Sequence, residues 1–146
     1  MICPRCGREA ETRETRYGPR SSCEPCGLWS WDFKPLVSAD VHEARKRCHA
    51  IFDRVWQRGE EAYPEAMAEG RSPKKFRRIT RVRGYRMIAY LTCMPEPECH
   101  MGEQTNLAKL AKIEQVAKTL TPKRIREWWQ EKGRDWWNPT KQPVEA

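Results

Sequence analysis

The spacing of the hydrophobic residues changes at about residue 38. Before this point, polar and hydrophobic residues alternate, and the alternation predicts a strand with Trp29, Trp31 and Phe33 on one face. Residues 17–22 contain Gly, Pro and Ser, which predict a turn ahead of that strand. After residue 38, hydrophobic residues recur three or four positions apart, as is typical of amphipathic helices. The pattern therefore predicts short strands followed by helices.

The helical part is predicted to contain about four helices. Ser38 or Asp40 can cap the first, Ser72-Pro73 and Thr121-Pro122 are start signals for later ones, and Gly133 is expected to end the last. The buried side of the helix that begins near Pro73 is predicted to carry Val82, Tyr85, Ile88 or Ala89, and Leu91. Four arginines are expected on its exposed sides: Arg77, Arg81, Arg83 and Arg86.

Composition excludes two broad classes. The chain has 146 residues, of which 38% are hydrophobic and 33% charged, and its seven Trp are too many for a fully disordered chain. No apolar run is long enough to cross a membrane, and the first residues lack the apolar stretch of a secretory signal. We therefore expect a soluble, cytoplasmic protein without a membrane partner.

Four of the seven cysteines lie in the first 26 residues, as two Cys-x-x-Cys pairs that sixteen residues separate. The pairs are Cys3 with Cys6 and Cys23 with Cys26, and a glycine follows each pair. Two such turns can supply a closed tetrahedral shell of thiolates, which structural zinc prefers. The spacing predicts one structural Zn²⁺ with no open position for catalysis. Unligated thiols, two disulfides or an iron–sulfur centre are the alternatives.

Together these patterns predict a small α+β protein with an N-terminal zinc ribbon of short strands and an α-helical domain of about four helices. The expected boundaries are 1–36 for the ribbon, 37–121 for the helical domain and 122–146 for a Trp-rich C-terminal helix and tail. The aromatic face of the ribbon has two interpretations: it packs on the rest of the protein, or it is an exposed platform on which bases stack.

Positive charge is concentrated in residues 71–86, which hold eight basic side chains and no acidic one. This tract accounts for the whole net charge of +8, because the other residues carry twenty charges of each sign. Such a localised field favours a polyanionic partner, DNA or RNA, over a merely solvated charged face. The predicted phosphate-binding residues are Lys74, Lys75, Arg77, Arg78, Arg81, Arg83 and Arg86.

Four tryptophans near the C-terminus form a second candidate site: Trp128, Trp129, Trp136 and Trp137. In one interpretation, one Trp of each pair docks on the core and the other is partly exposed. In the other interpretation they form a partner-binding patch, because exposed Trp dominates interface hot spots. In a regular helix, Trp129 and Trp136 would share a face.

Several motifs occur in a characteristic order: the two cysteine pairs, A-R-K-R-C-H-A-I-F-D-R-V-W over 44–56, R-G-Y-R-M-I-A-Y-L over 83–91 and C-H-M-G over 99–102. In this order the chain resembles the zinc-finger-containing domain family of small phage and bacterial proteins, over about residues 2–115. The resemblance implies zinc, a compact α-rich body and a phage or prophage origin, hence a bacterial host cytoplasm. It assigns no reaction. His49, Asp53, Trp56 and His100 fall on the family pattern, with a structural role expected and a catalytic His–Asp pair as the alternative.

The sequence contains no phosphate-binding loop, nucleophile elbow or zinc-protease helix, so we expect a protein without catalytic residues. The leading hypothesis is a zinc-ribbon protein that binds nucleic acid through the basic tract. The rival is a phage-encoded interaction factor that inhibits or redirects a host enzyme or defence complex. A second metal site at Cys93, Cys99 and His100 is not expected, because only three ligands are visible there.

Overall fold

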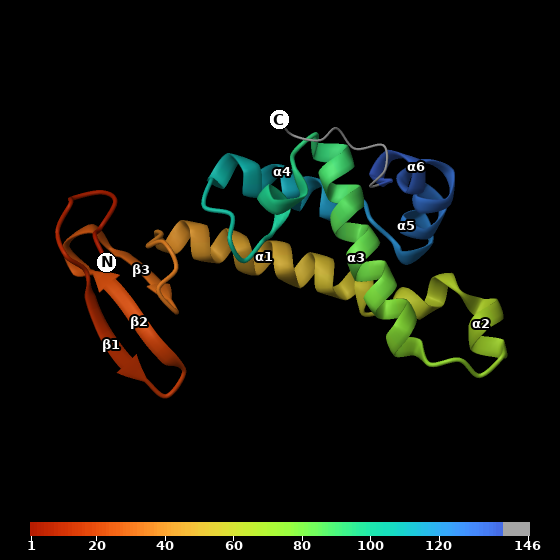
Figure 1. The fold of residues 1–146 in the computed structure, drawn as a ribbon, viewed down its shortest axis with the longest axis horizontal. Helices are drawn as coiled ribbons and strands as arrows, with labels where there is room; N and C mark the ends of the chain where they lie inside the picture. Colours follow the sequence, from red (N-terminus) through yellow and green to blue (C-terminus); the bar gives the residue numbers. More distant parts are fainter. Residues whose placement is uncertain (139–146) are drawn as a thin grey trace.

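The computed structural model describes residues 1–138 and shows a sheet at one end of an elongated molecule, followed by helices (Figure 1). The sheet is antiparallel, with strand order β1-β2-β3. Its strands are β1 (Glu11–Thr15), β2 (Gly18–Cys23) and β3 (Leu28–Trp31), and the single 3₁₀ turn η1 (Glu24–Cys26) joins the last two. The predicted small α+β class and the N-terminal position of the strands are therefore confirmed.

The pairing register places unlike residues on the two faces of the sheet. Ser21 lies opposite Ser30, and both are buried; the Ser30 hydroxyl donates a hydrogen bond to the Lys34 carbonyl at 2.6 Å. On the other face, Arg20 lies opposite Trp31. The expected alignment of Phe33 with the tryptophans is wrong, because Asp32 and Phe33 adopt positive φ angles of 51° and 59° and end the strand at Trp31. Phe33 is 60% exposed in this turn.

Up to residue 138, four longer helices and two short ones follow the sheet, and the number of longer ones agrees with the expected number. The longer helices are α1 (Ala39–Trp56), α3 (Pro73–Thr92), α4 (Leu107–Ala117) and α5 (Pro122–Trp128). The short elements are α2 (Pro64–Ala68), α6 (Arg134–Trp137) and the 3₁₀ turns η2 (Gly59–Ala62) and η3 (Glu96–Cys99). Both proline start signals are confirmed, and the Thr121 hydroxyl accepts a hydrogen bond from the backbone N–H of Arg124 at 3.1 Å.

One hydrophobic core joins α1, α3, α4 and α5 (Figure 1). Phe52, Ile88 and Ile113 are completely buried in it, and Ile125 brings residues beyond 121 into the same core. α1 and α3 approach closely because Gly84 has no side chain: a Cβ there would lie 2.6 Å from Phe52 Cε1. A separate small core in the sheet module contains Leu28 and Leu36, which lie beside the cysteines.

The buried side of α3 differs from the predicted one. Val82 is 39% and Leu91 37% exposed, so these two assignments are wrong, whereas Tyr85, Ile88 and Ala89 are buried as expected. The N-terminal half of α3 packs on η2 and α2 through Phe76 and Thr80, whereas Gly84, in its second half, faces Phe52 of α1 and Ile125 of α5. Periodicity alone missed Thr80 and Gly84 because Thr and Gly are not counted as hydrophobic.

The expected helix end at Gly133 is wrong, because the chain continues through a π-helical turn (Trp129–Gly133) into α6. Gly133 has helical φ and ψ, and a Cβ there would lie 2.6 Å from the Trp128 ring. Glycine is therefore needed for packing and not for termination. The π turn inserts one extra residue, so Trp128 contacts Trp136 and Trp129 contacts Trp137, eight positions apart instead of seven.

The sheet module is attached to the helices by Trp29 and His42. Their rings stack with centroids 3.6 Å apart, and His42 Nε2 lies 2.9 Å from the Trp29 carbonyl oxygen. Burial is the largest cause that lowers the pKa of His42, and the nearby positive charges of Arg45, Lys46 and Arg20 act in the same direction. Of the two interpretations of the aromatic face, packing on the rest of the protein therefore describes Trp29.

Among residues 1–138, none of the helices has the length and hydropathy that a transmembrane span requires.

Candidate metal centre and basic surfaces

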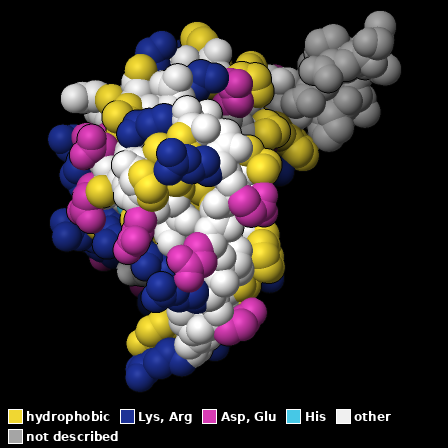
Figure 2. All heavy atoms as spheres, turned by 90° about the vertical axis from the view of Figure 1, so that its left-hand side faces the viewer, with side chains coloured by type: hydrophobic (Ala, Val, Ile, Leu, Met, Phe, Trp, Pro, Cys, Tyr) yellow, Lys and Arg dark blue, Asp and Glu magenta, His cyan; other side chains and the backbone are white. Residues whose placement is uncertain are grey.

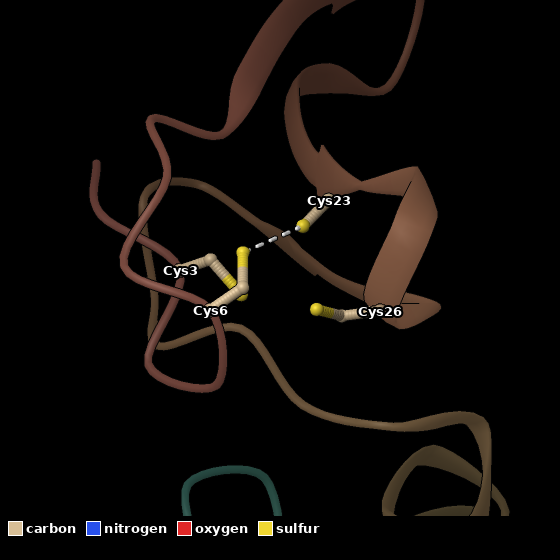
Figure 3. Close-up of side chains that lie close together, drawn as sticks. All are labelled: Cys3, Cys6, Cys23 and Cys26. Atoms are coloured by element: carbon tan, nitrogen blue, oxygen red, sulfur yellow. Dashed lines mark hydrogen bonds between the residues drawn. The ribbon is translucent and has the colours of Figure 1, made fainter.

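The four N-terminal cysteines converge on one point (Figure 3). Their Sγ atoms all lie within 4.8 Å of one another, and the Sγ atoms of Cys6 and Cys23 are 3.7 Å apart. Four sulfurs bound to a tetrahedral zinc ion at about 2.3 Å are separated from one another by about 3.8 Å. A disulfide needs sulfurs at about 2.05 Å, so this separation fits ligands of a shared ion and not a bridge.

Two tight turns present these thiols. Cys3 and Cys6 lie on the turn before β1, while Cys23 ends β2 and Cys26 ends η1. Gly7 and Gly27, one after each pair, adopt left-handed φ angles of 75° and 68°, which residues with a side chain rarely reach. The two turns are joined because Arg5 Nη1 donates a hydrogen bond to the Cys26 carbonyl at 3.2 Å.

Because the four thiols lie so close together, their pKa values differ from one another. A backbone N–H of Cys6 is the main cause that lowers the pKa of Cys3 to about 7. Burial, followed by the neighbouring thiols, raises the pKa of Cys26 to about 12. Because thiolates repel one another, complete deprotonation of the four requires a cation among them. The donor set therefore suits one metal ion, and its closed sulfur shell leaves no position for a substrate.

Within residues 1–138 this is the one group of three or more potential ligands close enough to share an ion. Cys93 is exposed and Cys99 is buried, with its Sγ 3.8 Å from the Thr92 hydroxyl. Among the described residues, these two cysteines and His100 do not come close enough together to form such a group.

The basic tract occupies the end of the helical part next to α2, and its residues divide into two sets. Lys74, Lys75, Arg78 and Arg81 are exposed on one face of α3, because they recur three and four positions apart. Arg71, just before the helix, is exposed as well. Within the described chain none of these five side chains forms an ion pair, so their charges face solvent uncompensated. We call this set the basic stripe.

Three further predicted residues make internal contacts instead. Arg77 donates two hydrogen bonds of 2.9 Å to the Glu60 carboxylate, and these hydrogen bonds are the main reason why the pKa of Glu60 is lowered. Arg83 donates to the Tyr63 hydroxyl at 3.1 Å. Arg86 lies 3.5 Å from the centroid of the Trp137 ring. These three arginines are half-buried and are less available to phosphates than the basic stripe.

Two of the C-terminal tryptophans, Trp129 and Trp137, contact the half-buried Arg83 and Arg86. Trp128 and Trp129 are both buried, which differs from the expectation that one Trp of each pair stays partly exposed. Arg83 and Arg86 lie over the Trp129 ring at 5.0 and 5.4 Å. Trp136 is 42% exposed, and it is the member of the set that a partner could reach most easily. The sequence analysis predicts two separate sites, one of arginines and one of tryptophans, whereas in the fold these residues contact each other.

The family-pattern residues gather where α1, α3 and the turn after η3 meet. Asp53 Oδ1 accepts a hydrogen bond from Trp56 Nε1 at 2.8 Å, and the His100 ring stacks on Tyr85 with centroids 5.4 Å apart. His49 lies beside Gly102, where a Cβ would approach its ring to 3.6 Å. The Asp53 carboxylate is therefore hydrogen-bonded to the Trp56 indole, and this contact fits the expected structural role.

Sequence reasoning missed two features of the surface. Arg81 belongs to the basic stripe but also lies 5.8 Å from the Trp56 ring and 5.4 Å from the Tyr85 ring. On the sheet, Arg20 lies 4.7 Å from the Trp29 ring. The contacts of Arg81 with Trp56 and of Arg20 with Trp29 do not follow from spacing along the chain, because each joins separate elements, whereas Arg81 and Tyr85 lie four positions apart on α3.

No protein-family model, curated protein or solved structure matches this chain. Membership in the zinc-finger-containing domain family therefore stays a prediction from the motifs.

Proposed function

We propose that this protein binds nucleic acid through the basic stripe on α3 and uses one Zn²⁺, held by Cys3, Cys6, Cys23 and Cys26, as a structural pin. The observation that carries the proposal is the row of four basic side chains without an ion pair in the described part of the chain, on one face of α3, together with Arg71 just before the helix. Basic side chains at this spacing attract phosphates irrespective of base sequence. The proposed action is binding without catalysis.

Contacts beneath the stripe support a rigid presentation of these charges. Phe76 and Tyr63 pack in a small core under the N-terminal half of α3, with ring centroids 4.6 Å apart. The Arg77–Glu60 pair fixes η2 against the same half of the helix. A stripe held in one conformation loses less side-chain and backbone entropy when it binds a polyanion.

The sulfur separations are compatible with a tetrahedral Zn²⁺, which would supply folding energy to the sheet module. Metal analysis of the purified protein is expected to give one zinc per chain. Cys6→Ser is expected to abolish this stoichiometry, whereas Cys93→Ser, at an exposed cysteine outside the cluster, is expected to retain it.

The nucleic-acid proposal is tested by charge reversal. A variant with Lys74, Arg78 and Arg81 changed to Glu is expected to lose measurable binding to duplex and single-stranded oligonucleotides at moderate salt. The wild type, with five phosphate contacts, is expected to show a log–log salt slope of about −4 to −5 for duplex DNA. Fluorescence anisotropy across a salt series measures both quantities.

A matched control separates a local effect from one of net charge. Lys112, Lys118 and Lys132 are exposed elsewhere on the helical part, and changing all three to Glu alters net charge by the same amount. This variant is expected to retain most of the affinity. If both triple variants bind equally, or if the wild type binds neither oligonucleotide, the proposal is wrong.

A second candidate function, a protein-interaction factor, is favoured by the exposed ring of Trp136. This residue touches Tyr90 and Trp128, so its position is fixed by the core. A pull-down from nuclease-treated lysate discriminates between the candidates. A stoichiometric protein that Trp136→Ala loses would favour the interaction factor, and loss of all partners after digestion would favour nucleic acid.

A further inference from the structure

The open face of the three-stranded sheet carries a second group of aromatic and basic side chains, at the opposite end of the molecule from the basic stripe (Figure 1). The register sets Arg13, Arg20 and Trp31 in one row across the three strands. A hollow of about 390 Å³ lies next to this row, lined by Arg13, Arg20 and Trp29 and also by the acidic Glu11 and Glu24. Figure 2 looks onto this end and shows basic side chains beside hydrophobic ones, with acidic ones between.

Trp31 is the central aromatic residue of the group. Its ring stands nearly perpendicular to Trp29, with centroids 6.0 Å apart, and nearly perpendicular to Tyr17, with centroids 6.5 Å apart. Trp29 is occupied by its stack on His42, but Trp31 is only half-buried and Tyr17 is 71% exposed. Two of the three rings therefore remain accessible to a flat ligand.

Guanidinium groups surround these rings. Arg20 lies 4.7 Å from the Trp29 ring and 6.0 Å from the Trp31 ring, and Arg16 lies 4.9 Å from the Tyr17 ring. The ion pair of Arg13 with Glu11 is exposed on both sides, so it stabilises little and a phosphate can replace the carboxylate. Cations that flank accessible aromatic rings are complementary to a chain of bases linked by phosphates.

We infer that this sheet face binds unpaired nucleotides, with bases on Trp31 and Tyr17 and phosphates at Arg13, Arg16 and Arg20. The inference rests on the proposed function and specifies its substrate as nucleic acid with a single-stranded segment. A duplex hides the faces of its bases in the stack, so it can engage the basic stripe but not these rings. The sheet face therefore favours single strands over duplexes.

The test compares a labelled single strand of about 12 nucleotides with a duplex of the same length, within the range that small single-strand modules cover. The variant Trp31→Leu with Tyr17→Leu removes both accessible rings. It is expected to weaken single-strand binding by about tenfold or more and to leave duplex binding unchanged. Trp31→Phe keeps a stacking surface and is expected to retain most of the single-strand affinity. Zinc content and circular dichroism verify that each variant is folded.

A second readout follows the ring itself. Single-strand addition is expected to quench tryptophan fluorescence in the wild type, and the quenching is expected to be smaller in Trp31→Phe because the reporting indole is gone. If the double variant binds single strands as tightly as the wild type, the sheet inference is wrong while the basic stripe can still stand. If charge reversal on the basic stripe changes neither affinity, the proposed function is wrong.

Discussion

Removing the metal is expected to unfold the sheet module, about residues 1–36, and to leave the helical part folded. The small core of the module contains two leucines, Leu28 and Leu36. Burial of two leucine side chains is worth about 3–6 kcal/mol in total. A structural zinc ion in a small module contributes about 10–16 kcal/mol at neutral pH. The larger of these stabilising terms is therefore lost on chelation.

The helical part is expected to survive because its core is separate. Phe52, Ile88, Leu110 and Ile113 are completely buried among helices and contact none of the cysteine ligands. Within residues 1–138, the ring stack that connects it to the module, His42 on Trp29, lies outside this core. Loss of the module should therefore expose the first turns of α1 without opening α3 and α4.

Hydrogen exchange measured on the full chain, before and after a zinc chelator, checks this expectation residue by residue. Amides of β1, β2 and β3 should exchange within seconds once the metal is removed, while amides in the middle of α1 and α3 should stay protected. Re-addition of zinc should restore protection. Protected strands in a protein shown to be metal-free would refute the reasoning, because the small core would then suffice to fold the module.

Three further predictions concern packing and pH. Gly84→Ala is expected to destabilise the fold by about 1–3 kcal/mol, because the new methyl group would lie 2.6 Å from Phe52; a wild-type urea midpoint would contradict this. Gly133→Ala is expected to lower the melting temperature because its Cβ would meet the Trp128 ring at 2.6 Å, and an unchanged melting curve would show that the ring moves freely. Because burial lowers the pKa of His42 below 6.5, protonation favours the unfolded chain and the free energy of unfolding should decrease as pH falls from about 7.5 to 5.5. His42→Gln should reduce this slope, and identical slopes would argue against the burial effect.

Features encoded by neighbouring residues could be predicted from the sequence. The convergence of four cysteines follows from two Cys-x-x-Cys turns, each of which closes on itself with a glycine in the left-handed region. The starts of α3 and α5 follow from Ser72-Pro73 and Thr121-Pro122, because Pro fits the first turn of a helix. These signals act over a few residues, and here the tertiary contacts agree with them, unlike at Gly133.

The accessible set of basic residues could not be predicted, because it depends on which segments dock on α3. Arg77 is hydrogen-bonded to Glu60 of η2, and Arg86 packs on Trp137 of α6, so both arginines are half-buried. Each partner is distant from its arginine along the chain. The π turn was not predicted either, because the sequence does not show that Gly133 packs against the Trp128 ring within a continuing helix. Spacing on α3 gave the angular position of each arginine, but the docked neighbours determined its exposure.

The separation of the two proposed surfaces leads to a selective effect of the metal on binding. The basic stripe stands on the helical core, whereas Trp31 and Arg20 belong to the module that the cysteines hold. Chelation should therefore abolish the preference for single strands and leave a salt-dependent affinity for both strands and duplexes. Anisotropy with the two oligonucleotides, before and after chelation, measures this difference. If chelation reduces binding to both oligonucleotides equally, the basic stripe does not act independently of the sheet. The assignment of phosphates to the stripe and of bases to the sheet face is then wrong.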